Sequence, residues 1–277
     1  MLTLYHLALM AEDIYPDDKS AIYGASFQTS VPQGLPNSSD LQRIEEKSDD
    51  GFAAAVYACG DSAAITFRGT DMSGAPVLMQ EATEKTPQFA RAVSFAEKAI
   101  QTHDLVQDRT YICGHSLGGA LTKYVAHHLA QSDWLAAAAV SFNAPGLTVS
   151  LLDKALVGGM SRLTEDMPIG VGIRAVYRLM QQVDIPADNQ TDARLVNVNL
   201  NGDIVSRVGE ASGRSYALDA PEFVAPEDFE IRNVAGFPRT EQGRTVVLRE
   251  VYLHSMHTLR RVLAEAPLGR RDPRDLA

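Results

Sequence analysis

Apolar positions in the first part of the chain follow two different periods. Within residues 2–11 they recur at the spacing of one helix face, which predicts an N-terminal helix packed on the rest of the domain. Two short apolar runs, 52–60 and 62–69, then flank Gly60-Asp61, a pair typical of a hairpin turn. The pattern therefore predicts a helix followed by two antiparallel strands at one end of a sheet.

Helical and strand patterns alternate farther along the chain. In chain order, the predicted elements are a helix around 89–100, a strand at 109–113, a helix at 117–129, strands at 135–142, 194–200 and 244–250, and a closing helix at 253–263. A mostly parallel sheet with helices on both faces requires such an alternation. We therefore predict an α/β fold.

Four segments are less regular. Residues 30–50 read as a polar connector, and residues 71–87 as a loop or a short surface helix. Residues 147–193 contain broken helical pieces and are expected to form a helical insertion over the site, whereas the tail at 267–277 is expected to be frayed. Because open α/β sheets of this size usually stay undivided, residues 1–277 are expected to form a single domain.

Composition and charge narrow the classes of partner. The net charge of −10 disfavours a nucleic-acid partner, because such partners are usually met by a basic surface. No segment approaches the roughly 20 apolar residues that a membrane span needs. The first residues lack the basic start of a cleavable signal peptide, so we expect a protein that is cytoplasmic or exported by another route. Cys59 and Cys113 lie in apolar runs and are expected to be buried free thiols.

A short motif carries the candidate chemistry. Residues 114–118, Gly-His-Ser-Leu-Gly, match the Gly-x-Ser-x-Gly pattern and stand directly between a predicted strand and a predicted helix. In that position Ser116 would occupy a sharp turn at a helix N-terminus, where free N–H groups face a developing oxyanion. Ser116 is therefore the candidate nucleophile.

A serine nucleophile needs a histidine base held by a carboxylate, and in this fold their chain order is Ser, Asp, His. His254 and His257 are the histidines that follow the last predicted strand. His257 would lie on a polar helix face, so we favour His254, which precedes the helix with Ser255 as its cap.

The favoured acid is Asp203, in the turn Asn201-Gly202-Asp203 directly after a predicted strand. The turn itself is an alternative reason for these residues, since Asn, Gly and Asp are common in turns. Asp184 and Asp219 are the alternative acids.

The oxyanion hole is expected to combine the backbone N–H of Leu117 with a second donor after an earlier strand. Thr70, which follows the run at 62–69, fits this place and could add its hydroxyl. A threonine that only caps the turn is the alternative interpretation.

Taken together, FRGT, GHSLGGALT, FNAPG, NGDIVS and a late HSM span residues 65–257 and resemble the class 3 lipases, a branch of the α/β hydrolases. The resemblance implies a lipase or phospholipase that needs no metal or cofactor, with Ser116, Asp203 and His254 as its triad and Thr70 in its oxyanion hole. The Gly-Asp-Ile-Val-Ser turn and the His-Ser-Met ending are more like bacterial members.

In such lipases the segment after the first motif often forms a lid, which here would be residues 71–87. A lid would let the enzyme contact a lipid interface, although this segment lacks a tryptophan-bearing amphipathic helix. The expected substrate is a lipid ester. The alternatives are a soluble short-chain or aryl ester, a thioester, an amide or peptide, or no turnover at all in a binding module.

Overall fold

The computed structural model describes residues 2–15, 42–47, 52–69, 88–147, 189–223, 249 and 252–277. Within them the strands form one sheet in the order β1 to β7. The strands are β1 (Gln42–Lys47), β2 (Ala53–Cys59), β3 (Ser62–Phe67), β4 (Thr110–His115), β5 (Ala138–Phe142), β6 (Leu195–Leu200) and β7 (Arg214–Leu218). β1, β2 and β3 pair antiparallel, and the pairs from β3 to β7 are parallel.

The predicted hairpin is confirmed. β2 and β3 pair antiparallel across a turn at Gly60, whose positive φ of 58° suits a residue without a Cβ atom. The polar connector predicted at 30–50 is wrong in part, because residues 42–47 form β1 and pair with β2. The sequence of this strand, QRIEEK, is largely charged and therefore resembles a connector. A strand at the sheet edge does not need the apolar run that a central strand has.

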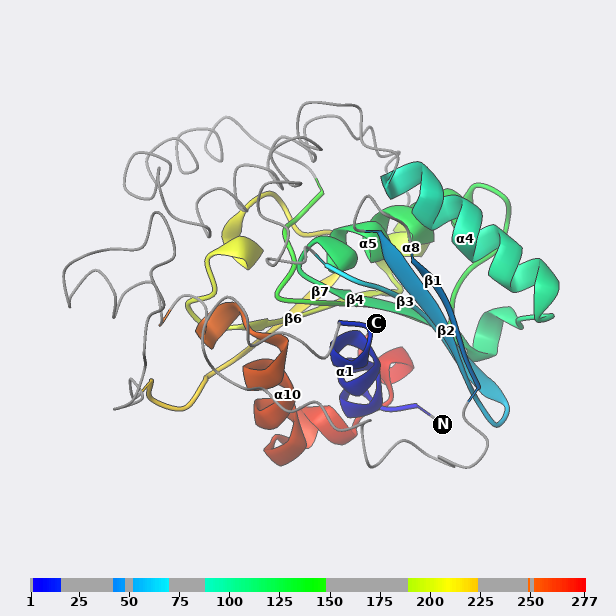
Figure 1. The fold of residues 1–277 in the computed structure, drawn as a ribbon. Helices are drawn as coiled ribbons and strands as arrows, with labels where there is room; N and C mark the ends of the chain where they lie inside the picture. Colours follow the sequence, from blue (N-terminus) through cyan, green and yellow to red (C-terminus); the bar gives the residue numbers. More distant parts are fainter. Residues whose placement is uncertain are drawn as a thin grey trace.

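Helices cover both faces of the sheet (Figure 1). On one face, α1 (Leu4–Asp13) and α10 (Met256–Glu265) pack on alternate strand residues such as Tyr111 and Val140. On the other, α4 (Gln88–Thr102) and α5 (Leu117–Ala130) pack on residues of opposite parity such as Ile112. The short helix α8 (Asn189–Asp192) lies before β6. The predicted α/β architecture is therefore confirmed.

Both cysteines are buried free thiols, as predicted. Burial raises the pKa of Cys59 to about 11 and that of Cys113 to about 12. Neither thiol therefore forms the reactive thiolate at neutral pH.

The prediction of a frayed tail at 267–277 is wrong. The tail forms two 3-10 turns, η4 (Pro267–Arg270) and η5 (Pro273–Asp275), and Leu276 is buried in the core beside α1 and α10. The Tyr216 hydroxyl donates a hydrogen bond to the Leu276 carbonyl at 3.0 Å, and the Tyr111 hydroxyl donates one to Asp272 at 3.2 Å. A polar composition misled the prediction, because one apolar side chain and one buried carboxylate suffice to anchor the segment.

Several predicted features lie outside the described residues: the segment 71–87, most of the insertion at 147–193, and the strand at 244–250 apart from Arg249. Of the helices that the structure describes, none has the length and apolar character to cross a membrane. Two further 3-10 turns, η2 (Gln107–Arg109) and η3 (Val205–Arg207), complete the described elements.

Candidate active site

Ser116 stands at a sharp turn between β4 and α5. Its φ of 57° and ψ of −125° are strained for a residue with a side chain, and such strain is characteristic of functional turns. The turn is tight enough to need glycine on both sides. A Cβ atom would lie 2.3 Å from the Gly118 carbonyl oxygen if added at Gly114, and 2.1 Å from that of Phe67 if added at Gly118.

The structure brings His254 between Ser116 and Asp203. The Nδ1 atom of His254 lies 2.9 Å from Asp203 Oδ1, and its Nε2 atom lies 2.9 Å from Ser116 Oγ. Because a carboxylate can only accept, Nδ1 carries the proton and Nε2 is left to accept from the serine hydroxyl. The three side chains thus form one hydrogen-bonded chain with a fixed histidine tautomer.

Asp203 is 1% exposed, and both of its carboxylate oxygens have donors. Oδ1 accepts from His254, and Oδ2 accepts from the backbone N–H of Ser206 at 2.9 Å. The alternative acid Asp219 instead accepts from Asn201 Nδ2 at 2.6 Å and lies on the surface. Asp184, the other alternative, lies outside the described residues.

The alternative base, His257, does not reach Ser116. It lies in the first turn of α10 and donates from Nδ1 to Glu12 Oε1 on α1 at 3.1 Å. Ser255 is the N-cap residue of α10, as expected, although its side chain makes no capping bond.

Leu117 is the first residue of α5, so its backbone N–H belongs to the first turn, where no intrahelical acceptor exists. The other predicted oxyanion residue, Thr70, lies outside the described residues. Its neighbour Gly69 is described and lies against Ser116, since a Cβ atom built there would be 3.0 Å from Ser116 Cβ. The backbone just before Thr70 therefore approaches Ser116.

Three further residues surround these side chains and were not predicted from the sequence: Tyr15, His115 and Asn143. Their hydrogen bonds reach partners 100 or more residues away in the chain. No local spacing could have revealed them, because each pairs with a segment that only the fold brings near.

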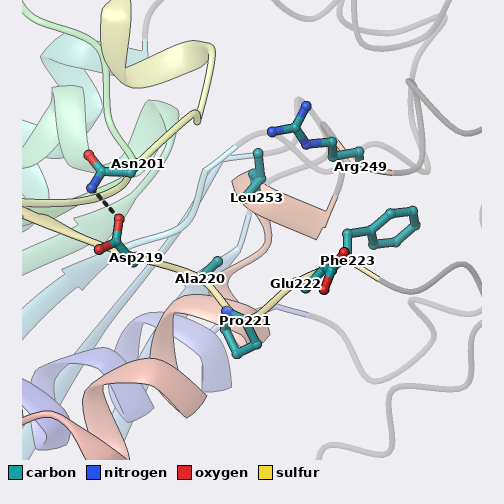
Figure 2. Close-up of a pocket in the computed structure, with 8 residues that line it drawn as sticks. All are labelled: Asn201, Asp219, Ala220, Pro221, Glu222, Phe223, Arg249 and Leu253. Carbon is teal, nitrogen blue, oxygen red and sulfur yellow. Dashed lines mark hydrogen bonds between the residues drawn. The ribbon is translucent and has the colours of Figure 1, made fainter.

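A pocket of about 390 Å³ lies next to Leu253, in the segment that carries His254 (Figure 2). It is lined by Asn201, Asp219, Ala220, Pro221, Glu222, Phe223, Arg249 and Leu253. Leu253 directly precedes His254 in the chain, yet neither Ser116 nor His254 lines this pocket. The pocket is therefore not where a bond held against Ser116 would be cleaved.

The model of one protein family, described as the Tle-like phospholipase domain, matches residues 6–236. The chain belongs to this family. It is accordingly a carboxylic ester hydrolase of the α/β-hydrolase fold, and the resemblance to lipase-like hydrolases is confirmed. No curated protein matches the chain.

Solved structures that match this chain include fungal and bacterial lipases. A mutant form of MDLA from Penicillium cyclopium is 12% identical, with a TM-score of 0.46 and 91% of this chain and 92% of that chain covered. A fungal lipase in an inhibitor complex is 14% identical, with a TM-score of 0.42 and coverage of 77% and 78%. Extracellular lipase LipA from Serratia marcescens is 16% identical, with a TM-score of 0.40, and the match covers 79% of this chain but only 35% of LipA.

Proposed function

We propose that this protein hydrolyses ester bonds of phospholipids through an acyl-enzyme formed on Ser116. The observation that carries the proposal is His254, which lies 2.9 Å from both Ser116 Oγ and Asp203 Oδ1. That geometry matches a nucleophile, a general base and an orienting carboxylate. The family supports the phospholipid as substrate.

In the first half of the reaction, Ser116 Oγ attacks the ester carbonyl carbon while its proton passes to His254 Nε2. The negative charge on the former carbonyl oxygen is stabilised by the Leu117 N–H and by Thr70. The carbon–oxygen bond of the ester then breaks, and the departing alcohol, a lysophospholipid, takes the proton from His254.

In the second half, water attacks the acyl carbon and gives a proton to His254, and the intermediate collapses to release the fatty acid and restore the Ser116 hydroxyl. Asp203 stays ionised throughout. It stabilises the imidazolium and keeps the proton on Nδ1, which leaves Nε2 free to act as the base.

The experiment compares wild type with Ser116→Ala on phospholipid vesicles, triacylglycerol emulsions and short soluble esters, with fatty-acid release as the readout. We expect wild type to prefer phospholipid and Ser116→Ala to lose nearly all activity while keeping its circular dichroism spectrum. Full activity in Ser116→Ala would overturn the nucleophile. A preference for short soluble esters would favour the soluble esterase instead.

Phospholipid presented as monomers or as vesicles tests contact with a lipid interface. We expect the rate on phospholipid to rise when monomeric lipid is replaced by vesicles at equal total lipid, because an interface presents the ester at high local density. Equal rates on both forms would contradict an interfacial enzyme.

A further inference from the structure

The backbone of His254 is held at two consecutive carbonyl groups. Asn143 Nδ2 donates to the Leu253 carbonyl at 2.9 Å, and His115 Nε2 lies 2.7 Å from the His254 carbonyl oxygen. We propose that Asn143 and His115 form a backbone clamp, a pair of positioning residues that keeps the His254 imidazole aligned between Ser116 and Asp203. The inference rests on the proposed function of His254.

His254 needs such support because of its place in the chain. It ends a short helical stretch, residues 252–254, and precedes the N-cap residue of α10, so its carbonyl and that of Leu253 stand at a helix end and have no intrahelical donor. It also lies outside the sheet. The two donors of the clamp, by contrast, stand at or just after the carboxyl ends of the neighbouring strands β4 and β5, which are rigid parts of the core.

Asn143 links the segments that carry His254 and Asp203. Its Oδ1 accepts from the Leu200 backbone N–H at 2.8 Å, at the end of the strand that leads to Asp203. Its Nδ2 donates to the carbonyl next to His254. The orientation of the amide is thereby determined, because a carbonyl must face the N–H donor and an NH₂ must face the carbonyl acceptor.

Its backbone supports the same conclusion. Asn143 is completely buried and has a φ of 43°, in the left-handed region, which asparagine adopts more often than most other residues with a side chain. A glycine would fit this conformation without strain, but a glycine could not connect Leu200 with Leu253.

His115 completes the clamp from the residue before the nucleophile. Since a carbonyl only accepts, Nε2 carries a proton and donates to His254. Its Nδ1 lies 2.8 Å from the Tyr15 hydroxyl, and that hydroxyl accepts from the Gly69 backbone N–H at 3.1 Å. A hydroxyl proton donated by Tyr15 to Nδ1 fits the tautomer with the ring proton on Nε2, which is the one that the clamp uses.

Loss of the clamp is expected to lower kcat and to spare KM. Proton transfer needs Nε2 within about 3 Å of Ser116 Oγ, and a misplacement of about 1 Å can cost on the order of a hundredfold in rate. Substrate binding does not depend on this alignment.

The test is Asn143→Asp beside a matched control, Asn197→Asp. Asn197 is 1% exposed, accepts from Ser141 Oγ at 2.8 Å and donates to the carbonyls of Ser212 at 2.7 Å and Arg214 at 3.4 Å, so its amide bridges two segments as that of Asn143 does. None of these bonds reaches the His254 segment. The two variants therefore lose the same donor in equally buried places, and only one of them loses the clamp.

We expect Asn143→Asp to lower kcat and the rate of fluorophosphonate labelling of Ser116 by roughly tenfold to a hundredfold with KM unchanged. Asn197→Asp should lower the melting temperature alone. Equal kcat in Asn143→Asp and wild type, or equal losses of kcat in both variants, would overturn the clamp. A wild type that is not labelled at Ser116 would instead overturn the proposed function, so the two failures are distinguishable.

His115 supplies a second pair of variants should Asn143→Asp fail to fold. His115→Leu removes the donor, whereas the amide of His115→Gln can still donate to the His254 carbonyl. We expect the first to lose kcat and labelling rate and the second to regain most of both. Equal kcat in the two variants would argue against a role for the donor.

Discussion

His257 Nδ1 lies 3.1 Å from Glu12 Oε1, across 245 residues of chain, so the second late histidine joins α10 to α1 and does not face Ser116. This contact predicts different outcomes for the two histidines. His254→Gln should lose ester hydrolysis by a factor of about a thousand or more, because no base remains beside Ser116. His257→Gln should keep kcat and lose about 1 kcal/mol of stability with its hydrogen bond.

Steady-state kinetics and urea unfolding of both variants measure these effects. A His257→Gln protein that is folded but inactive would contradict the assignment of His254 as the base.

The second prediction concerns acid stability and Glu12. Burial alone would raise the pKa of Glu12, but the hydrogen bond from His257 and the charge of Arg260 outweigh it and hold the pKa below 4.5. A carboxylate with a lowered pKa stabilises the fold above its unfolded value and stops doing so as the pH falls through its folded value. The stability difference between wild type and Glu12→Gln should therefore be full above about pH 5 and should narrow in acid.

Urea unfolding along a pH series measures that difference. Glu97→Gln is the control, since Glu97 is 46% exposed and pairs only loosely with His128 at 3.5 Å. A Glu12→Gln difference that stays constant down to acid pH would show that the ion pair does not set it.

The third prediction concerns Lys123, whose ammonium group is buried and donates to the Pro145 carbonyl at 2.8 Å. Burial lowers its pKa from 10.5 to about 7. Between these values the unfolded chain binds a proton that the folded protein lacks, so wild-type stability should rise with pH in this window. In Lys123→Met this rise of stability with pH is absent, because the titrating group is gone. The stability of the variant relative to wild type should therefore fall from about pH 7 to about pH 10.

Chemical unfolding of both proteins at the two ends of the window gives the comparison. A relative stability that does not change with pH would mean that Lys123 is protonated in the folded protein.

The fourth prediction uses the tight turn at Gly118. In a helix, replacing glycine by alanine usually gains about 1 kcal/mol. Here the added Cβ atom would lie 2.1 Å from the Phe67 carbonyl oxygen, a backbone atom at the end of β3 that cannot rotate away. Gly118→Ala should therefore lower the melting temperature, and it should slow labelling of Ser116 because the turn must shift. A Gly118→Ala protein as stable as wild type would refute the steric argument.

The fifth prediction concerns the C-terminal segment. Leu276 is 5% exposed and lies in the same core cluster as α1 and α10. Leu276→Ala should lower the free energy of unfolding by about 2–4 kcal/mol, as expected for a truncated core leucine. Val106→Ala, at a side chain that is 56% exposed, should change it by less than about 0.5 kcal/mol. Equal small effects from both substitutions would support the prediction that the tail is frayed.

The fold was predictable where neighbours in the chain are neighbours in space. The hairpin at Gly60, the α/β alternation and the turn at Ser116 all depend on contacts within a few residues, which leave a visible period or motif. β1 was not predictable in this way, because its partner strand, and not its own apolar content, makes it a strand. The order of the tail at 267–277 was not predictable either, because its contacts are with residues far away in the chain.

For the candidate site, the sequence by itself determined Ser116 and its turn, because the glycines that make the turn tight lie within two residues of it. It also determined the order in which an acid and a base could follow. Only the tertiary structure showed that His254, and not His257, lies beside Ser116, and only it revealed Tyr15, His115 and Asn143. The physical reason is that these side chains act through hydrogen bonds to segments 100 or more residues away, and a linear pattern does not encode which distant backbone groups the fold places within 3 Å.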